Sequence, residues 1–334
     1  MTDAATIAAD PAWLPHRIDL PARKVEFLHV PRGELADRGF LADRSAGPRG
    51  TATLSFDAVA AAAPKRAQTA HFLFHSAFCR STLLVRALDR QGAVAGLNEP
   101  NIIAALSGGG EAVRPLLAPL LAMLSRPSEE GEIVVMKPTN MANRLIPALM
   151  KECGEARAIL MTNSLEGFLG SVARRGLLGR RWGRQLFLDL QGYAGMDFGM
   201  PPADVFALTD LQAAGLAWFL SQRYFGALSQ GQVAGLGGER FRILDGDRFP
   251  ERREDTLAAS LEFFGVSDAR ELAGSLSTGD VFDHHAKLGG DAPIDSAPST
   301  DEKLAEEIAQ VGEWLAMIAG QAGVALPAPH DLFT

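Results

Sequence analysis

The sequence predicts an α/β fold, a three-layer α/β/α arrangement with a central, mostly parallel sheet. From residue 70 onward, short apolar stretches alternate with stretches of helical periodicity, which is the pattern of strand–helix–strand units. The first stretch, HFLFH (71–75), has the composition of a buried strand, as expected in a sheet covered on both faces. Polar residues follow four of the predicted strands, and ligands bind at the carboxyl ends of strands in such sheets.

The predicted elements follow one another in a regular order. Strands are expected at 71–75, 93–100, 132–140 and 156–164, with a further strand and turn at 240–249. Helices are expected at 81–91, in the leucine-rich stretch 116–124, and at 143–153, 165–176, 210–229, 254–265 and 301–323. The four polar strand ends read HSAFCRST, NEP, KPTN and TNS. Together they predict a binding site at one edge of the sheet.

The domain organisation is expected to be a main domain with an N-terminal extension. Residues 1–66 contain two strand-like pieces, VEFLHV and TATLSF, and are expected to form an extension packed on the core. Residues 67–334 are expected to form the main domain, with a helical region or lid at 176–235 and a C-terminal helix at 300–323. A short helix and connector is expected at 58–68.

Composition narrows the class of protein. The chain has 334 residues, is 47% hydrophobic and carries a net charge of −8, which argues against a general nucleic-acid surface. Its two cysteines, Cys79 and Cys153, are expected to be free thiols, which favours a reducing cytoplasm. No signal peptide and no membrane-spanning apolar run is recognised. The oligomeric state stays open, a homo-oligomer included.

The stretch HSAFCRST (75–82) suits a phosphate-binding loop because backbone N–H groups and a helix dipole meet there. Ser76, Ser81 and Thr82 add hydroxyl groups, and Arg80 adds a permanent positive charge. The alternative is a plain connector in which Ser81 caps the next helix. The loop contains no glycine, so left-handed backbone is not expected in it.

Two further strand ends carry charged residues. Glu99 ends the second strand and is a candidate general base, or else a carboxylate at a helix start. Lys137 ends the third strand and is a candidate for neutralising an anion, or else a surface lysine at the sheet edge.

An arginine-rich segment is a further candidate for anion binding, and a pair of histidines raises the question of a metal site. The segment VARRGLLGRRWGR (172–184) stands out in an acidic chain and suits phosphate or sulfate recognition, or else forms a solvated helix face. The pair His284 and His285 has no metal-ligand spacing around it, so no metal site is expected.

The order of these segments resembles the sulfotransferase family, which has a P-loop nucleotide-kinase-like fold. The resemblance covers about residues 70–290 and is carried by FCRSTLL, NEP, Lys137-Pro138 and AILMTNSLEGFLGSVARRG. Downstream, RFRILDGDRFPERREDTLAASLEFFGV and FDHHAKLGG continue it. Its specificity lies in the order and spacing of the segments.

The resemblance implies a co-substrate, 3′-phosphoadenosine-5′-phosphosulfate (PAPS), which leaves as 3′,5′-adenosine bisphosphate (PAP). It implies donor contacts from Ser76, Ala77, Phe78, Cys79, Arg80, Ser81, Thr82, Asn163, Ser171, Arg174, Arg175 and Lys287. The implied catalytic residues are Glu99, Arg80 and Lys137.

The chain departs from the family pattern at three positions. The basic residue of the family's loop aligns with Phe78, its glycine with Arg80, and its 3′-phosphate arginine with Asn163. Arg80 is a candidate for the first missing charge, and Arg174 or Arg175 for the second.

The function that this resemblance implies is sulfuryl transfer from PAPS to a hydroxyl, or alternatively an amine, of a small molecule or sugar, with residues 176–235 building the acceptor pocket or a lid over it. An ATP-dependent phosphotransferase is a first alternative, although the Gly-Lys-Ser/Thr of a P-loop kinase is missing. A non-catalytic nucleotide- or anion-binding relative is a second.

Overall fold

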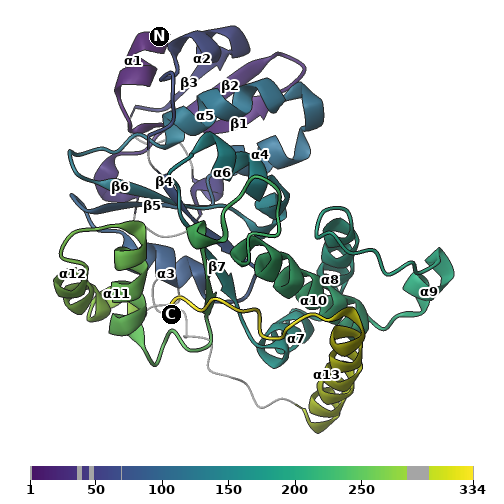
Figure 1. Ribbon diagram of the computed structural model, residues 1–334. Helices are drawn as coiled ribbons and strands as arrows, with labels where there is room; N and C mark the ends of the chain where they lie inside the picture. The colour runs from purple at the N-terminus through teal and green to yellow at the C-terminus, as the bar shows by residue number, and fades with distance from the viewer. Residues whose placement is uncertain (1, 36–39, 45–48, 69, 284–300, 334) are drawn as a thin grey trace. The chain divides into compact units, whose positions relative to one another are not determined.

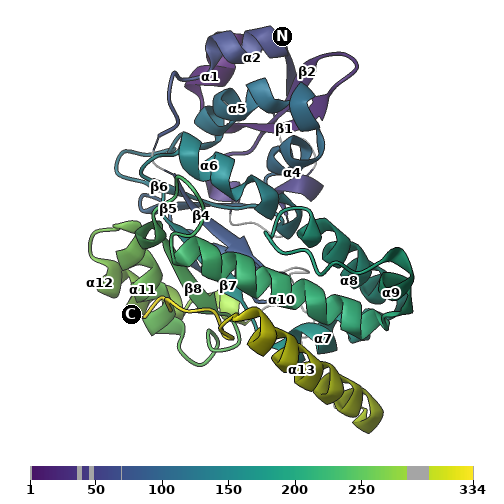
Figure 2. The same ribbon diagram turned by 45° about the vertical axis from the view of Figure 1, so that its right-hand side comes forward.

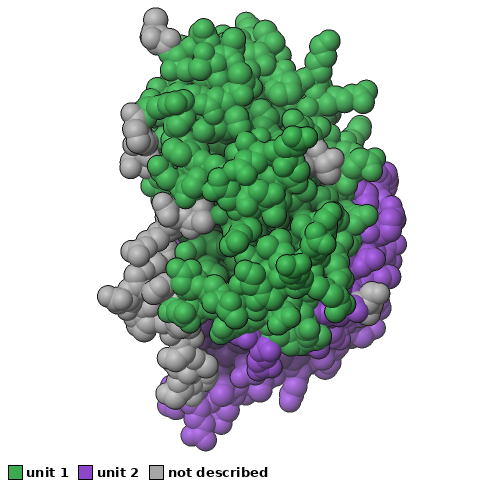
Figure 3. Space-filling view, turned by 90° about the vertical axis from the view of Figure 1, so that its left-hand side faces the viewer, with its two compact units in different colours: residues 1–74, 81–159, 252–294 green, residues 75–80, 160–251, 295–334 purple. Residues whose placement is uncertain are grey.

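The structure is a computed structural model that describes residues 2–35, 40–44, 49–68, 70–283 and 301–333. It divides into two compact units, drawn in two colours in Figure 3. Unit 1 comprises residues 1–74, 81–159 and 252–294, and unit 2 comprises residues 75–80, 160–251 and 295–334.

A five-stranded parallel sheet with the strand order β5-β6-β4-β7-β8 confirms the predicted fold class (Figure 1). Its strands are β4 (Ala70–His75), β5 (Val94–Asn98), β6 (Ile133–Lys137), β7 (Ala158–Thr162) and β8 (Phe241–Asp245). β6 pairs in parallel with β5, Val94 opposite Ile133, and with β4, Ala70 opposite Val134. Every residue of β4, β5 and β7 is buried, as expected for strands covered on both faces. With its flanking helices, the sheet forms a three-layer α/β/α arrangement.

Unit 1 contains the helices that follow β4, β5 and β6, and two helices that come after β8 in the chain. They are α3 (Ser81–Leu88), α4 (Asn101–Gly108), α5 (Leu117–Leu124), α6 (Ile146–Glu152), α11 (Arg253–Phe264) and α12 (Ala269–Ser277). α3 lies so close to β5 that a Cβ atom at Gly96 would stand 2.8 Å from the carbonyl oxygen of Val85. α11 ends at Gly265, whose φ of 81° is left-handed, and it lies beside α12 in Figures 1 and 2.

The N-terminal part of unit 1 has more regular structure than the sequence predicts. It contains α1 (Ala4–Ala9), β1 (Trp13–Asp19), β2 (Lys24–His29), β3 (Thr51–Ser55) and α2 (Phe56–Ala62). β2 and β3 confirm the two strand-like pieces, and all three strands form an antiparallel sheet. β1 was not expected, because Pro15 interrupts its pattern; the register shifts there between Pro15 and Arg17, as strands tolerate proline at irregularities.

A buried arginine fastens the N-terminal segment to the rest of unit 1. Arg126, which follows α5, donates hydrogen bonds to the carbonyl oxygens of Ile7 (2.8 Å), Ala8 (2.7 Å) and Trp13 (2.8 Å). Burial lowers the pKa of Arg126 to about 10, against the opposing charge of Asp10. These bonds hold the segment from Ile7 to Trp13 against the end of α5. The two units do not divide at residue 66, and an extension that comprises residues 1–66 stays a prediction.

Unit 2 is mainly helical. Its helices are α7 (Leu165–Arg174), α8 (Gly176–Gln191), α9 (Pro202–Ala207), α10 (Asp210–Ser229) and α13 (Glu302–Ala322). α10 begins with a capping box between Thr209 and Gln212, and it is buried on nearly all sides. Figures 1 and 2 show α8 and α13 beside it. Gly215 permits this packing, because a Cβ atom there would stand 2.8 Å from Val311 of α13.

Short 3₁₀ turns complete the described chain. They are Arg32–Glu34, Leu41–Asp43, Gly110–Ala112, Arg114–Leu116, Asn140–Leu145, Gly238–Arg240 and Asp280–Phe282.

Candidate functional site

The loop after β4 has an unusual backbone. Ala77, Phe78 and Arg80 adopt left-handed φ angles of 82°, 56° and 61°, although none of them is glycine. The expectation that a glycine-free loop avoids this region is therefore wrong. Residues other than glycine take such angles at a cost of about 1–3 kcal/mol each, and they concentrate at functional sites.

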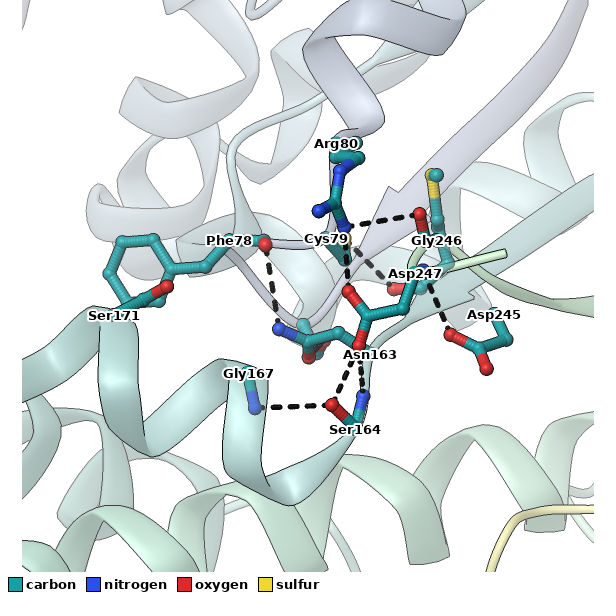
Figure 4. Close-up of polar contacts among 12 residues, drawn as sticks. Phe78, Cys79, Arg80, Asn163, Ser164, Gly167, Ser171, Asp245, Gly246 and Asp247 are labelled. Carbon is teal, nitrogen blue, oxygen red and sulfur yellow. Dashed lines mark hydrogen bonds and ion pairs between the residues drawn. The ribbon is translucent and has the colours of Figure 1, made fainter. Parts of the chain in front are cut away.

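Hydrogen bonds from the end of β7 hold this loop in place (Figure 4). The backbone N–H of Ser76 donates to the carbonyl oxygen of Met161 at 3.0 Å, and Cys79 Sγ donates to the same oxygen at 3.4 Å. The Asn163 side chain accepts from the Ser76 hydroxyl at 3.3 Å and donates to the carbonyl oxygen of Phe78 at 3.4 Å. Asn163 is itself buried, and its side chain holds the loop at two points, Ser76 and Phe78.

Arg80 is tied to the segment that follows β8. Its guanidinium donates to Asp247 at 2.6 Å and to the carbonyl oxygen of Gly246 at 3.3 Å. The other carboxylate oxygen of Asp247 accepts from the backbone N–H (2.9 Å) and the hydroxyl (2.6 Å) of Ser164, the N-cap of α7. The positive charge that the sequence places at Arg80 is thus compensated by Asp247 within unit 2.

The two aspartates after β8 differ in protonation behaviour. Burial raises the pKa of Asp245, and the hydrogen bond from the N–H of Asp247 opposes this only in part. Burial also acts on Asp247, but the hydrogen bonds from Ser164 and Arg80 outweigh it and lower the pKa of that carboxyl. Asp247 is therefore a carboxylate at neutral pH.

A basic cluster at the end of α7 lies next to the loop. Arg174 donates to the Ser171 hydroxyl at 2.9 Å, and Arg175 donates to the Ser171 carbonyl oxygen at 2.8 Å. The Arg175 guanidinium carbon lies 4.1 Å from the centroid of the Phe78 ring. The structure thus brings together Phe78, Ser171, Arg174 and Arg175; their contact with a donor stays a prediction.

A second group of predicted residues lies in unit 1, where the ends of β5 and β6 meet. Lys137 Nζ lies 2.5 Å from Glu99 Oε1, and the Glu99 N–H donates to the Lys137 carbonyl oxygen at 2.7 Å. Lys137 is wholly buried, and its ammonium lies 5.6 Å from the centroid of the Phe40 ring. The expected surface alternative for Lys137 is therefore wrong. Glu99 also has a left-handed φ of 50°, and its side chain is 22% exposed, so its carboxylate remains reachable from solvent.

The remaining predicted residues are partly placed. Ser81 and Thr82 begin α3 and are buried; their contact with a donor stays a prediction. Lys287, His284 and His285 lie outside the described residues. Within the described ranges, no group of three or more His, Cys, Asp or Glu residues is arranged to hold a metal ion, and no helix has the length and apolar character to cross a bilayer.

Asp247 is the residue of this site that sequence reasoning missed. It stands in LDGDRF, within the strand and turn predicted at 240–249, two residues after the end of β8. The same criterion that selected the other polar strand ends would have selected it. Gly246 belongs with it, because a Cβ atom at this position would stand 2.0 Å from the carbonyl oxygen of Cys79.

Comparisons with known proteins complete the description of the site. No family model and no curated protein matches the chain. Among solved structures, it is similar to the sulfotransferase domain from the curacin biosynthetic pathway, at 15% identity and a TM-score of 0.43 over 79% of this chain and 100% of that chain. It is also similar to a sulfotransferase from Alicyclobacillus acidocaldarius, at 14% identity and a TM-score of 0.43 over 78% and 98% of the two chains. The sulfotransferase domain of a Synechococcus olefin synthase is 13% identical, with a TM-score of 0.42 over 76% and 96%. At these identities the likeness concerns the fold, and the reaction has to be inferred from the residues of the site.

Proposed function

We propose that the protein transfers a sulfuryl group from PAPS to a hydroxyl, or alternatively an amine, of a small molecule or sugar. The observation that carries this proposal is the Ser171–Arg174–Arg175 cluster beside the loop at Phe78. Two guanidinium groups and a hydroxyl suit a nucleotide with phosphate groups at two positions. These clustered positive charges contrast with the net charge of −8 of the whole chain.

The chemistry of these residues fits the PAPS donor. Ser171 and Arg174 would hold its 3′-phosphate, and the loop from Ser76 to Thr82 would receive its 5′-phosphosulfate. When bound, the donor supplies the sulfuryl group and a stable leaving group, PAP. The loop needs little reorganisation to receive an anion, because hydrogen bonds with Asn163 and Asp247 already fix Phe78 and Arg80.

Glu99 would accept the proton of the acceptor hydroxyl. As the acceptor oxygen bonds to sulfur, the bond between sulfur and the donor's phosphate oxygen breaks, and the acceptor proton passes to the Glu99 carboxylate. Lys137 would orient that carboxylate through their 2.5 Å contact. The positively charged side chains of the donor-binding site would stabilise the negative charge that develops on the phosphate of the leaving group.

Calorimetric titration with PAP tests the proposal, with ATP–Mg²⁺ and 5′-AMP as comparisons. We expect micromolar binding of PAP that depends on its 3′-phosphate. Transfer from labelled PAPS to a panel of hydroxyl and amine acceptors then tests the reaction. Binding of ATP–Mg²⁺ alone would favour the phosphotransferase. Binding of PAP without transfer to any acceptor would favour a non-catalytic relative, and binding of neither nucleotide would reject the proposal.

A further inference from the structure

The Phe78 side chain sits on a platform of aromatic rings within unit 2. The ring centroids of Trp182 and Phe168 lie 5.0 Å and 5.8 Å from that of Phe78, and the two platform rings lie 6.1 Å from each other. Trp182 belongs to α8 and Phe168 to α7. A phenylalanine held by two helices is a rigid surface rather than a loose loop side chain.

Arg175 lies over this rigid ring. Its guanidinium carbon is 4.1 Å from the Phe78 centroid, well within the ~6 Å range of a cation–π interaction. A second contact fixes its direction, because one N–H donates to the Ser171 carbonyl oxygen at 2.8 Å. The cation–π contact and this hydrogen bond therefore hold the Arg175 cation at the loop.

The position of the Arg175 guanidinium has to be considered together with the other charges at the loop. Arg80, the cation within the loop itself, forms an ion pair with Asp247 at 2.6 Å. Position 78, where the loop of the family that the sequence resembles carries a basic residue, is phenylalanine in this chain. The guanidinium of Arg175, the residue after α7, is stacked on this ring.

We infer that Arg175 supplies the donor-binding charge that the loop lacks, and that Phe78 is the residue that positions it. The group recognised is the 5′-phosphosulfate or 5′-phosphate of the nucleotide. Arg174, on the Ser171 hydroxyl, serves the 3′-phosphate. This assignment rests on the proposed function and refines it. Arg175, at the end of α7, would provide the positive charge that residue 78 of the loop does not provide.

The test is a charge swap between two positions. PAP binding is measured by calorimetry for the wild type, Arg175→Ala, Arg174→Ala, and each of these combined with Phe78→Lys. We expect each single arginine variant to bind PAP about 10- to 100-fold more weakly, as for the loss of a charge-assisted contact. Phe78→Lys should restore affinity in the Arg175→Ala background to within a few-fold of the wild type. It should not restore the Arg174→Ala variant.

Two further variants act as controls. Arg270→Ala removes an exposed arginine of α12 and should leave PAP affinity unchanged, since bulk positive charge is not the cause. Phe78→Leu keeps an apolar side chain, of somewhat smaller volume, but removes the π face, and it should weaken binding several-fold. Thermal unfolding checks that every variant is folded.

The outcomes separate this inference from the proposed function. Unchanged affinity in Arg175→Ala, rescue of neither arginine variant by Phe78→Lys, or equal rescue of both would overturn the role of Arg175 while leaving the sulfotransferase proposal standing. Absence of PAP binding by the wild type would reject the proposed function itself, and this inference with it.

Discussion

Asp247 joins Arg80, in the loop after β4, to Ser164, at the start of α7, through contacts of 2.6 Å on each side. One carboxylate thereby connects two segments that are far apart in sequence. We expect Asp247→Ala to lower the free energy of unfolding by about 2 kcal/mol at pH 7, the loss typical of hydrogen bonds to a charged group. Urea unfolding measures this change, with Asp204→Ala, at an exposed position of α9, as the control.

The pH dependence of that difference is a second readout for the same variant. The folded protein has a lowered pKa at Asp247, so the stabilisation is complete above the pKa of the unfolded carboxyl, about 4. It disappears as the pH falls further, through the folded pKa. The wild type and Asp247→Ala should therefore approach each other in stability below about pH 4. A constant difference down to pH 2 would show that the carboxylate charge is not involved.

Gly246 leaves no space for a side chain against the loop. A Cβ atom there would stand 2.0 Å from the Cys79 carbonyl oxygen and 2.9 Å from the Met161 side chain. Backbone cannot yield as easily as a flexible side chain, so we expect Gly246→Ala to displace the loop, to cost about 1–3 kcal/mol in stability and to weaken PAP binding. Calorimetry and urea unfolding measure the two effects.

The matched control for Gly246→Ala is Gly320→Ala in α13, where no atom lies within 4 Å of the added Cβ. Alanine is the better helix former there by about 0.5–1 kcal/mol, so this variant should be slightly more stable than the wild type. Equal tolerance of alanine at both positions would contradict the packing of Gly246 against Cys79.

Glu99 and Lys137 allow the catalytic and structural parts of their contact to be separated. Glu99→Gln keeps a hydrogen-bonding side chain near the Lys137 ammonium but removes the proton acceptor. We expect turnover to fall about 10²- to 10⁴-fold, with PAP affinity unchanged. Glu99→Ala instead removes the carboxylate partner of a buried ammonium and should also cost about 3 kcal/mol in stability. Full activity of Glu99→Gln would remove Glu99 from the reaction.

The elements that the sequence predicted well are those whose residues share one environment. The strands β4, β5 and β7 are buried along their whole length, so their apolar runs are unambiguous. The predicted helix 210–229 coincides with α10, whose start is marked by the Thr209–Gln212 capping box. Local chemistry was sufficient in both cases.

The features that the sequence did not predict depend on distant contacts. Ala77, Phe78 and Arg80 adopt left-handed backbone angles although no glycine in the loop indicates them. The hydrogen bonds that hold the loop involve Asn163 and Asp247, which are distant in sequence. The stacking of Arg175 on Phe78 likewise requires the chain to return to the loop. A pattern of spacing along the sequence contains no information about such pairings.

His71 makes the stability of the protein depend on pH in a range where few side chains titrate. It lies within β4, stacks on Phe264 with ring centroids 5.0 Å apart, and its Nδ1 accepts from the Arg157 N–H at 3.1 Å. Burial first, and then the charge of Arg157, lower its pKa to about 4. The folded protein therefore keeps His71 neutral at a pH where the unfolded chain, with a pKa of about 6.5, takes up a proton.

The stabilisation from neutral His71 is complete above about pH 6.5 and is lost as the pH falls toward 4, with no further loss below the folded pKa. A difference of about 2.5 pKa units corresponds to about 3 kcal/mol. Urea unfolding between pH 7.5 and 4 should show this loss in the wild type. His71→Asn retains an acceptor for the Arg157 N–H but does not titrate, so its stability should fall by about 3 kcal/mol less over the same range. Parallel pH profiles for the two proteins would mean that His71 is not the group responsible.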